Sequence, residues 1–239
     1  PDTDSVYASV PGVNRQINGQ LESPYMDEYS IGYGVQIGSK GYFRADYINR
    51  SWANFYVNTT NMSTGQVEDS LGNRFDLRLI NNSSDYHQRK YDGVQMSGSY
   101  RFTDRLNLGA NYTYATLKGT AEGEASGSAT DSITAADAYP EFREPEWNTP
   151  NHYLGGDIRH RFNGWISYDL PMGRFGNLNF SWLERFRTGS PYYQNATIST
   201  ASYVTNPGYL QPDYTWTYWF DVENENRTED EHRSDLGIN

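Results

Sequence analysis

Hydrophobic and polar residues alternate with a period of two through residues 93–114, GVQMSGSYRFTDRLNLGANYTY. Such alternation is typical of β-strands whose two faces differ, and a helix would show a longer period. The TDR triplet in the middle predicts a tight turn, so we interpret the stretch as a hairpin. One face of this hairpin is small and polar, and the other is apolar and rich in tyrosine. The apolar positions are Val94, Met96, Tyr100, Phe102, Leu106, Leu108, Tyr112 and Tyr114.

The same alternation recurs along the chain and predicts roughly six to eight strands. In residues 157–170 the apolar positions continue as Phe162, Ile166, Tyr168 and Leu170, whereas Trp165 departs from the alternation. We therefore predict an all-β fold built as an antiparallel meander. The other candidate strands are residues 30–38, 42–58, 74–79, 177–187 and 232–239.

Short and long connections alternate between these candidate strands. SKG, TDR and PMGRFG are tight turns, while the connections at about residues 59–73, 119–155 and 189–231 are long and polar. In a meander every second connection lies at the same end of the sheet, so one end has short turns and the other has long loops. This asymmetry is typical of bacterial outer-membrane barrels, which have short periplasmic turns and long outer loops.

The height of the apolar band indicates what the two faces meet. Counted away from the TDR turn, the apolar positions run from Phe102 to Val94 and then give way to Asp92 and Lys90. That is about nine residues, and a tilted strand needs about 9 to 11 to cross the hydrocarbon layer. We therefore predict that the apolar face meets lipid, with aromatic residues, among them Trp52, near the edges of the band.

The opposite face would then line a watery or plugged interior, which leaves its charged side chains open to two interpretations. They either line a path for anionic solutes or hold an internal domain by ion pairs, or they are simply solvated. Because an open sheet edge in hydrocarbon would leave backbone groups unpaired, further strands must close the barrel. The charged positions expected on this face are Arg44, Asp46, Arg101, Arg159, Arg161, Asp169, Arg185 and Arg187.

Composition agrees with a barrel and excludes several other classes. Hydrophobic residues make up only 36% of the 239 residues, aromatic residues make up 15%, and 21 are tyrosines. No run of about 18 apolar residues exists that would form a transmembrane helix. The chain contains no cysteine, so it has no disulfide framework, thiolate metal site or cysteine nucleophile.

The net charge of −11 is concentrated in two of the long connections. Residues 119–155 and 189–231 together hold 14 of the 30 acids but 2 of the 19 bases, a net charge of −12 that leaves +1 for the remainder. This acidity makes nucleic acid an unsuitable partner. The acidic loops are interpreted either as solvated segments or as groups that bind divalent cations or the cation-bridged lipopolysaccharide layer.

The chain lacks a motif that would support covalent chemistry. GYGVQIG, residues 32–38, has the wrong spacing for a dinucleotide loop and no helix after it. Ser190 is followed directly by Pro191 and lacks the setting of a nucleophile elbow. A zinc site from His152, Asp157 and His160 would straddle a loop and a strand end. We therefore expect no enzyme activity, no metal and no cofactor.

Several segments carry a resemblance to a known family. RKYDGVQMSGSYRF, TDRLNLGANYTYATLKG, HRFNGWISYDLPMGRFG and TGSPYY resemble strands and turns of TonB-dependent outer-membrane receptors, and in particular the Oar-like group. The resemblance covers about residues 28–118 and 156–239. It implies a barrel of about 22 strands around a plug, and energised uptake of a small or peptide ligand through a TonB-type inner-membrane partner.

On this interpretation the 239 residues are one partial barrel domain from inside a longer chain, because they end within the alternating run RSDLGIN. The plug and the segment that contacts the energising protein would lie outside it. Outer-membrane lipid and lipopolysaccharide are the expected surroundings. Two alternatives stay open: a passive porin or a surface receptor or adhesin barrel, and a soluble extracellular β-sandwich that binds carbohydrate through its aromatic residues.

Overall fold

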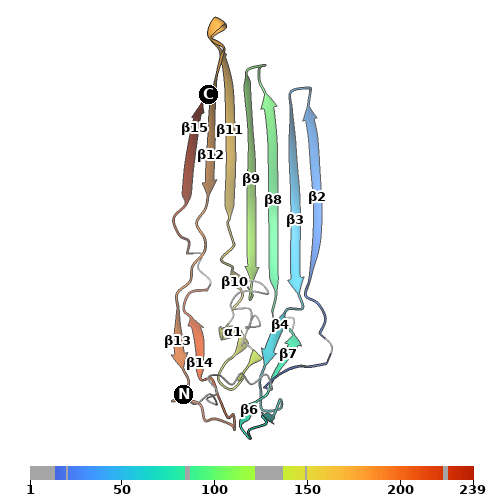
Figure 1. The fold of residues 1–239 in the computed structure, drawn as a ribbon, viewed down its shortest axis with the longest axis vertical. Helices are drawn as coiled ribbons and strands as arrows, with labels where there is room; N and C mark the ends of the chain where they lie inside the picture. Colours follow the sequence, from blue (N-terminus) through green and yellow to red (C-terminus); the bar gives the residue numbers. More distant parts are fainter. Residues whose placement is uncertain (1–13, 20, 84–86, 122–136, 149, 223–225) are drawn as a thin grey trace, which may run out of the picture.

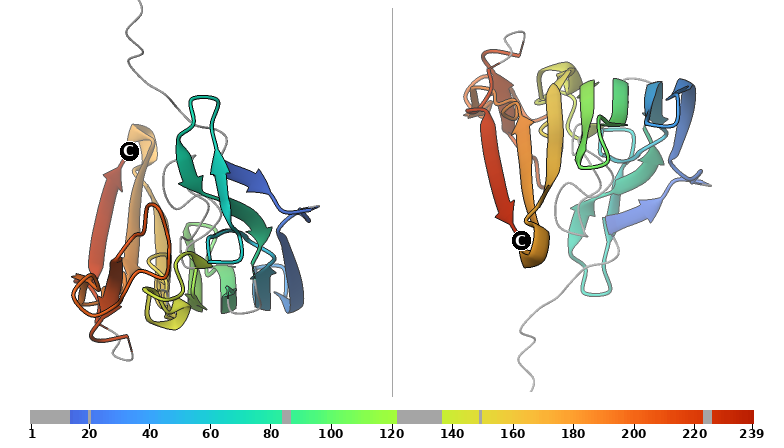
Figure 2. Two further views of the ribbon diagram at one scale, coloured as in Figure 1. Left: turned by 90° about the horizontal axis from the view of Figure 1, so that it is seen from below. Right: turned by 90° about the horizontal axis from the view of Figure 1, so that it is seen from above.

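A curved antiparallel sheet, here called the wall, dominates this computed structural model (Figures 1 and 2). The structure describes residues 14–19, 21–83, 87–121, 137–148, 150–222 and 226–239. The expectation of an all-β antiparallel meander is confirmed, because each long strand pairs with the next long strand of the chain. The long strands are β2 (Tyr25–Ile37), β3 (Gly41–Ala53), β8 (Arg89–Arg101), β9 (Leu106–Gly119), β11 (His160–Pro171), β12 (Asn177–Arg187) and β15 (Glu231–Ile238).

The wall is an open sheet. Its strand order is β15-β12-β11-β9-β8-β3-β2, and the short strand β10 (His152–Tyr153) pairs with the outer end of β9. Within the described residues, β2 and β15 each have one unpaired edge. The wall is therefore an arc, and it does not close on itself.

Short and long connections separate to opposite ends, as the sequence predicts. The turns β2–β3, β8–β9 and β11–β12 lie at the top of Figure 1, and the long connections gather at the bottom. Two of the tight turns use glycines in the left-handed region, Gly38 with φ 56° and Gly176 with φ 94°. Glycine adopts this conformation without the steric cost of a side chain. A short 3-10 turn, Gly173–Phe175, precedes Gly176.

Cross-strand register aligns the apolar positions of neighbouring strands. Met96 lies opposite Tyr112, and Tyr112 lies opposite Phe162 on its other side. Because side chains alternate along a strand, this pairing puts most apolar residues of the long strands on one face of the wall, the apolar face. The other face, the polar face, carries residues such as Ser97 and Asn107.

Trp165 lies on the polar face, where it covers a glycine on the neighbouring strand. It is paired directly with Gly109, and a Cβ atom added at Gly109 would lie 2.3 Å from the indole ring. The departure of Trp165 from the alternation is thus explained by a cross-strand partner: the missing side chain leaves room for a large ring. The ring fills the space above Gly109 on the polar face.

The connection between β3 and β8 forms small sheets beyond the wall. β4 (Tyr56–Thr59), β7 (Arg78–Asn82) and β1 (Arg15–Ile17) form one sheet, and β5 (Gln66–Glu68) pairs with β6 (Arg74–Asp76). The expectation that residues 74–79 lead into the wall as one strand is therefore corrected. The alternation is present, but it is divided between β6 and β7, which belong to different sheets.

The other two long connections also contain regular structure. Residues 188–230 include the hairpin of β13 (Asn195–Ser199) and β14 (Thr215–Trp219), and the β9–β11 connection includes the single turn α1 (Pro145–Asn148). These elements and the small sheets form the outer cap, defined as the described parts of residues 54–88, 120–159 and 188–230. Within the described residues, no helix is long and apolar enough to span a membrane.

The buried core lies in the outer cap and at the adjoining strand ends. Tyr139, Phe142 and Tyr209 form a buried aromatic cluster with Ala138, and Tyr139 and Tyr209 meet edge to face at 4.9 Å between ring centroids. In contrast, Ile31 and Tyr33 on the apolar face of β2 are 73% and 70% exposed. No second sheet covers the apolar face within the described residues. The soluble β-sandwich alternative is therefore wrong, because a sandwich would bury that face.

Replacing Gly109 by alanine should destabilise the wall, because the new Cβ would collide with the Trp165 ring. We expect a loss of about 1 to 3 kcal/mol in the free energy of unfolding, the usual cost of overpacking. Urea unfolding of the full-length protein in lipid vesicles measures the change. Gly34→Ala is the matched control, since Gly34 lies on the same face and its added Cβ would make only an ordinary contact at 3.9 Å. Equal losses at the two glycines would contradict the proposed collision.

Candidate functional site

Charged side chains on the polar face are neutralised in the part of the wall formed by β2 and β3. Arg44 donates from Nε and Nη2 to the two carboxylate oxygens of Asp46, both at 2.7 Å. Arg50 donates to Glu28 across the strand pair at 2.5 Å. In each case one arginine faces one carboxylate, so these groups contribute little net charge to the face.

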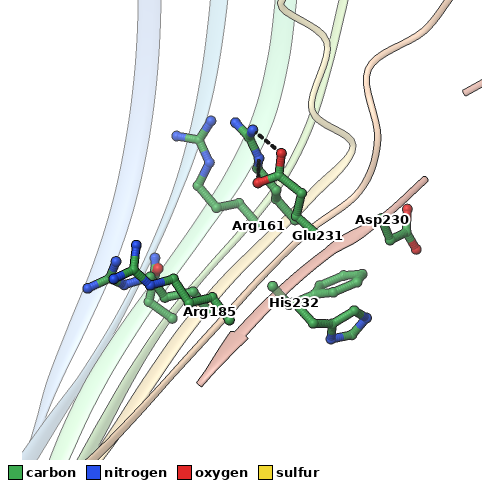
Figure 3. Close-up of a pocket in the computed structure, with 9 residues that line it drawn as sticks. Arg161, Arg185, Asp230, Glu231 and His232 are labelled. Atoms are coloured by element: carbon green, nitrogen blue, oxygen red, sulfur yellow. Dashed lines mark hydrogen bonds and ion pairs between the residues drawn. The ribbon is translucent and has the colours of Figure 1, made fainter. Parts of the chain in front are cut away.

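The opposite part of the wall carries a group of four arginines, here called the arginine cluster: Arg161, Arg185, Arg187 and Arg233. They come from β11, β12 and β15, and they line a cavity of about 690 Å³ together with Asn163, Phe186, Asp230, Glu231 and His232. Figure 3 shows Arg161 and Arg185 extending to one side of the strands and His232 and Asp230 to the other. The arginines and Glu231 therefore share the polar face.

The cluster is only partly neutralised. Arg187 donates to both carboxylate oxygens of Glu231, the interaction drawn in Figure 3. Asp235 is shared by Arg233 at 3.2 Å and Arg185 at 3.6 Å. Arg161 has no ion-pair partner within the described residues. The expected positions Arg161, Arg185 and Arg187 are thus brought together, and Arg233 is a member that the sequence reasoning missed.

Two further expected positions lie at the short-turn end of the polar face. Asp169 accepts a hydrogen bond from the Asn179 side chain at 2.7 Å, and Arg101 is exposed opposite Asn107. Neither contributes to the arginine cluster. Both positions therefore fit ordinary solvation in a polar interior.

Arg159 is corrected, because it lies in a buried ion-pair group and does not face an open interior. Asp157, whose side chain is 0% exposed, binds Arg159 and Arg227. The Asp157 carboxylate also accepts the backbone N–H of Leu117, and the Arg159 guanidinium lies 4.6 Å from the centre of the Tyr153 ring. This group ties the connection that precedes β15 to the outer ends of β9 and β11.

Trp52 is also corrected. The register aligns it with Met26 and Arg89 on the polar face, and the Arg89 guanidinium lies 5.0 Å from the centre of its ring. Trp52 therefore cannot belong to an aromatic girdle on the apolar face. The alternation in residues 42–58 is irregular, so the sequence assigned this residue to the wrong face.

The three residues considered for zinc are not brought together as ligands. His152 contacts the Pro150 carbonyl through Nδ1 at 2.6 Å, His160 contacts the Tyr112 hydroxyl at 2.7 Å, and Asp157 is occupied by arginines. Among the residues that the structure describes, no group of three or more His, Asp or Glu side chains is arranged to hold a metal ion. GYGVQIG, except for its last glycine, lies inside strand β2, where it cannot form a phosphate-binding loop.

Buried polar contacts hold the outer cap together. Arg143 binds Asp213 and donates to the Thr215 carbonyl at 2.7 Å, and its burial lowers the pKa of the guanidinium. Burial and the hydrogen bond to Glu141 raise the pKa of the Tyr209 hydroxyl, which therefore stays protonated and donates. Several acids of the long connections thus have structural partners, which the count of charges along the sequence could not reveal.

One acid interrupts the apolar face. Glu184 lies between Trp182 and Phe186 on that face of β12, opposite Gly164, and the Ser234 hydroxyl of β15 donates to its carboxylate. A carboxyl group among apolar residues is costly unless it has a hydrogen-bond partner. Sequence reasoning missed this residue because its partner lies on a strand 50 residues away.

Comparison with known proteins identifies the family. The model of the outer membrane beta barrel domain matches residues 1–229. This chain belongs to that family. The outer membrane beta barrel domain is therefore located in the bacterial outer membrane. No curated protein and no solved structure matches the chain.

Membership in this family explains why the wall is open. A sheet with unpaired edges is not stable in hydrocarbon, where each exposed backbone N–H or C=O group costs several kcal/mol. The arc of this outer membrane beta barrel domain is therefore a part of a barrel, and the unpaired edges of β2 and β15 are the places where further strands continue it.

Replacing Asp157 by asparagine should loosen the outer cap, because it removes the buried carboxylate charge that binds Arg159 and Arg227. Breaking a buried ion pair from one side costs about 3 to 5 kcal/mol. Limited proteolysis of the full-length protein in membranes should then show faster cleavage within residues 188–230. Asp104→Asn, in an exposed turn, is the control and should leave the cleavage rate unchanged. An unchanged rate in Asp157→Asn would show that the ion-pair group does not secure the cap.

Proposed function

We propose that this domain is a wall segment of a TonB-dependent outer-membrane transporter that takes up a ligand too large or too scarce for porins. The observation that carries the proposal is the combination of a charged polar face with a folded outer cap at the end of the same strands. A passive pore needs only a hydrated interior, whereas ligand capture needs structured outer segments and specific interior groups. The resemblance of the strand and turn motifs to the Oar-like receptors supports the same function.

The apolar face, on this proposal, meets outer-membrane lipid. Its residues form rows across neighbouring strands, such as Leu106, Tyr168 and Phe180. Beyond the outer edge of the band, Lys90 lies directly opposite Lys118 on the same face. These two exposed lysines, at the level of the headgroups, could bind the phosphates of lipopolysaccharide. Without an anion between them, two like charges directly opposite each other would destabilise the strand pair.

The proposed role involves binding and transport, without covalent chemistry, a metal or a cofactor. The acidic outer segments also make nucleic acid an unsuitable partner. A surface receptor or adhesin is the second candidate, since a folded outer cap would serve it equally well. Energised transport differs from it by the requirement for a TonB-type partner in the inner membrane.

A direct binding experiment tests the energised role. The full-length protein, in detergent micelles, should bind the purified periplasmic domain of the TonB-type protein of the same cell in a saturable manner, as measured by surface plasmon resonance. Proteolytic removal of the segment expected to contact the energising protein should abolish the signal. A full-length protein that shows no binding would favour a passive barrel or a receptor over a transporter.

The assignment of the faces predicts opposite tolerance of neighbouring positions. Met96→Arg and Leu108→Arg would put a charge into lipid and should each cost about 2 to 4 kcal/mol near the middle of the bilayer, which would block assembly. Ser97→Arg and Asn107→Arg put the same charge into the interior and should be tolerated. The heat-modifiable, folded fraction of the full-length protein in outer membranes measures assembly. Equal tolerance at both pairs of positions would refute the proposed orientation.

A further inference from the structure

Two pairs of arginines in the arginine cluster face each other across neighbouring strands. Arg161 is the direct partner of Arg187 in the β11–β12 register, and Arg185 is the direct partner of Arg233 in the β12–β15 register. Like charges directly opposite each other destabilise a sheet. A sequence that needed only a hydrated face could avoid this cost with neutral polar residues, as it does at Ser167 and Ser181 on the same strands.

The charge on this part of the polar face stays positive after its own acids are counted. Four guanidinium groups share the face with two carboxylates, Glu231 and Asp235, because Asp230 points to the opposite side (Figure 3). The Asp230 carboxylate instead accepts the backbone N–H of Gly189 at 3.0 Å. On β2 and β3, in contrast, each of two arginines has its own acid. The excess of positive charge is therefore confined to the part of the polar face formed by β11, β12 and β15.

The cavity beside the cluster has the size and the donors for an anion with more than one charged group. Its volume of about 690 Å³ falls within the usual range for small-molecule sites. Arginine presents a planar fork of N–H donors that matches carboxylate and phosphate oxygens in pairs. Within the described residues Arg161 has no carboxylate partner, and the only carboxylate paired with Arg185 is the shared one of Asp235, at 3.6 Å.

We propose that the arginine cluster is a binding site for a solute that carries two or more carboxylate or phosphate groups. The proposal rests on the proposed function in one respect, namely that the polar face lines the interior of the barrel. One anionic group would bridge Arg161 and Arg187, and a second would bind between Arg185 and Arg233. Each would add negative charge between two arginines that face each other across neighbouring strands.

Calorimetric titration of the full-length protein in detergent micelles with citrate and with inorganic pyrophosphate tests the site. We expect Arg161→Gln and Arg185→Gln each to weaken binding at least about tenfold, which corresponds to about 1.4 kcal/mol. High ionic strength should weaken binding to the unsubstituted protein as well. Arg105→Gln, which removes an exposed arginine from the β8–β9 turn, is the control and should bind the probes normally.

Two results would overturn the proposal: equal affinity of the unsubstituted protein and both cluster variants, or failure of the unsubstituted protein to bind either probe. Heat modifiability of each variant shows whether its barrel has folded, so a loss of binding is not mistaken for a loss of structure. The arginine substitutions at Met96 and Ser97 report separately on the orientation of the faces. An absence of TonB binding would remove the energised role and leave the anion site intact.

Discussion

The hydrogen-bonded register between adjacent strands is the constraint on which the rest of this domain depends. In hydrocarbon every backbone N–H and C=O must be hydrogen-bonded to a neighbouring strand, so few cross-strand registers are stable. Because the side-chain period is two, a slip of one residue would carry Met96 and Leu108 to the polar face and Ser97 and Asn107 to the apolar face. Tight turns with glycines of positive φ, such as Gly38 and Gly176, hold this register at one end of the wall.

At the other end, the wall is secured by ordinary protein packing. The wall itself buries little apolar surface within the described residues, whereas the outer cap has an aromatic cluster and buried ion pairs that would suit a soluble protein. The domain therefore changes from an exposed apolar band in the wall to a buried core in the outer cap. On the proposed orientation, lipid takes the place of a hydrophobic core along the band, and the Asp157 ion-pair group begins where the band ends.

The sequence predicts the wall well because its information is local. Alternation, turn residues and the length of the apolar run are all readable within one hairpin, and they define most of the long strands and their faces. The same information does not predict contacts between distant segments. The edge-to-face contact of Tyr139 with Tyr209, the cover that Trp165 gives Gly109 and the hydrogen bond of Ser234 to Glu184 all depend on partners far away in the chain. Arg159 was misplaced because its ion-pair partner Asp157 is buried and is also bound by Arg227, 70 residues further along the chain.

The arginine cluster lies in the wall next to the two ends of the connection that joins β12 to β15. This position links the outer cap to the wall. Ser190 and Thr228 bond to each other across that base, and Asp230 accepts the N–H of Gly189. Glu231, the next residue, begins β15 and neutralises Arg187. A displacement of the connection that moved Glu231 would remove the counter-charge of Arg187 and raise the positive potential of the cavity. The electrostatics of this part of the polar face are thus set partly by the connection that precedes β15. For the transport function proposed above, such a link would couple capture at the surface to binding inside the barrel.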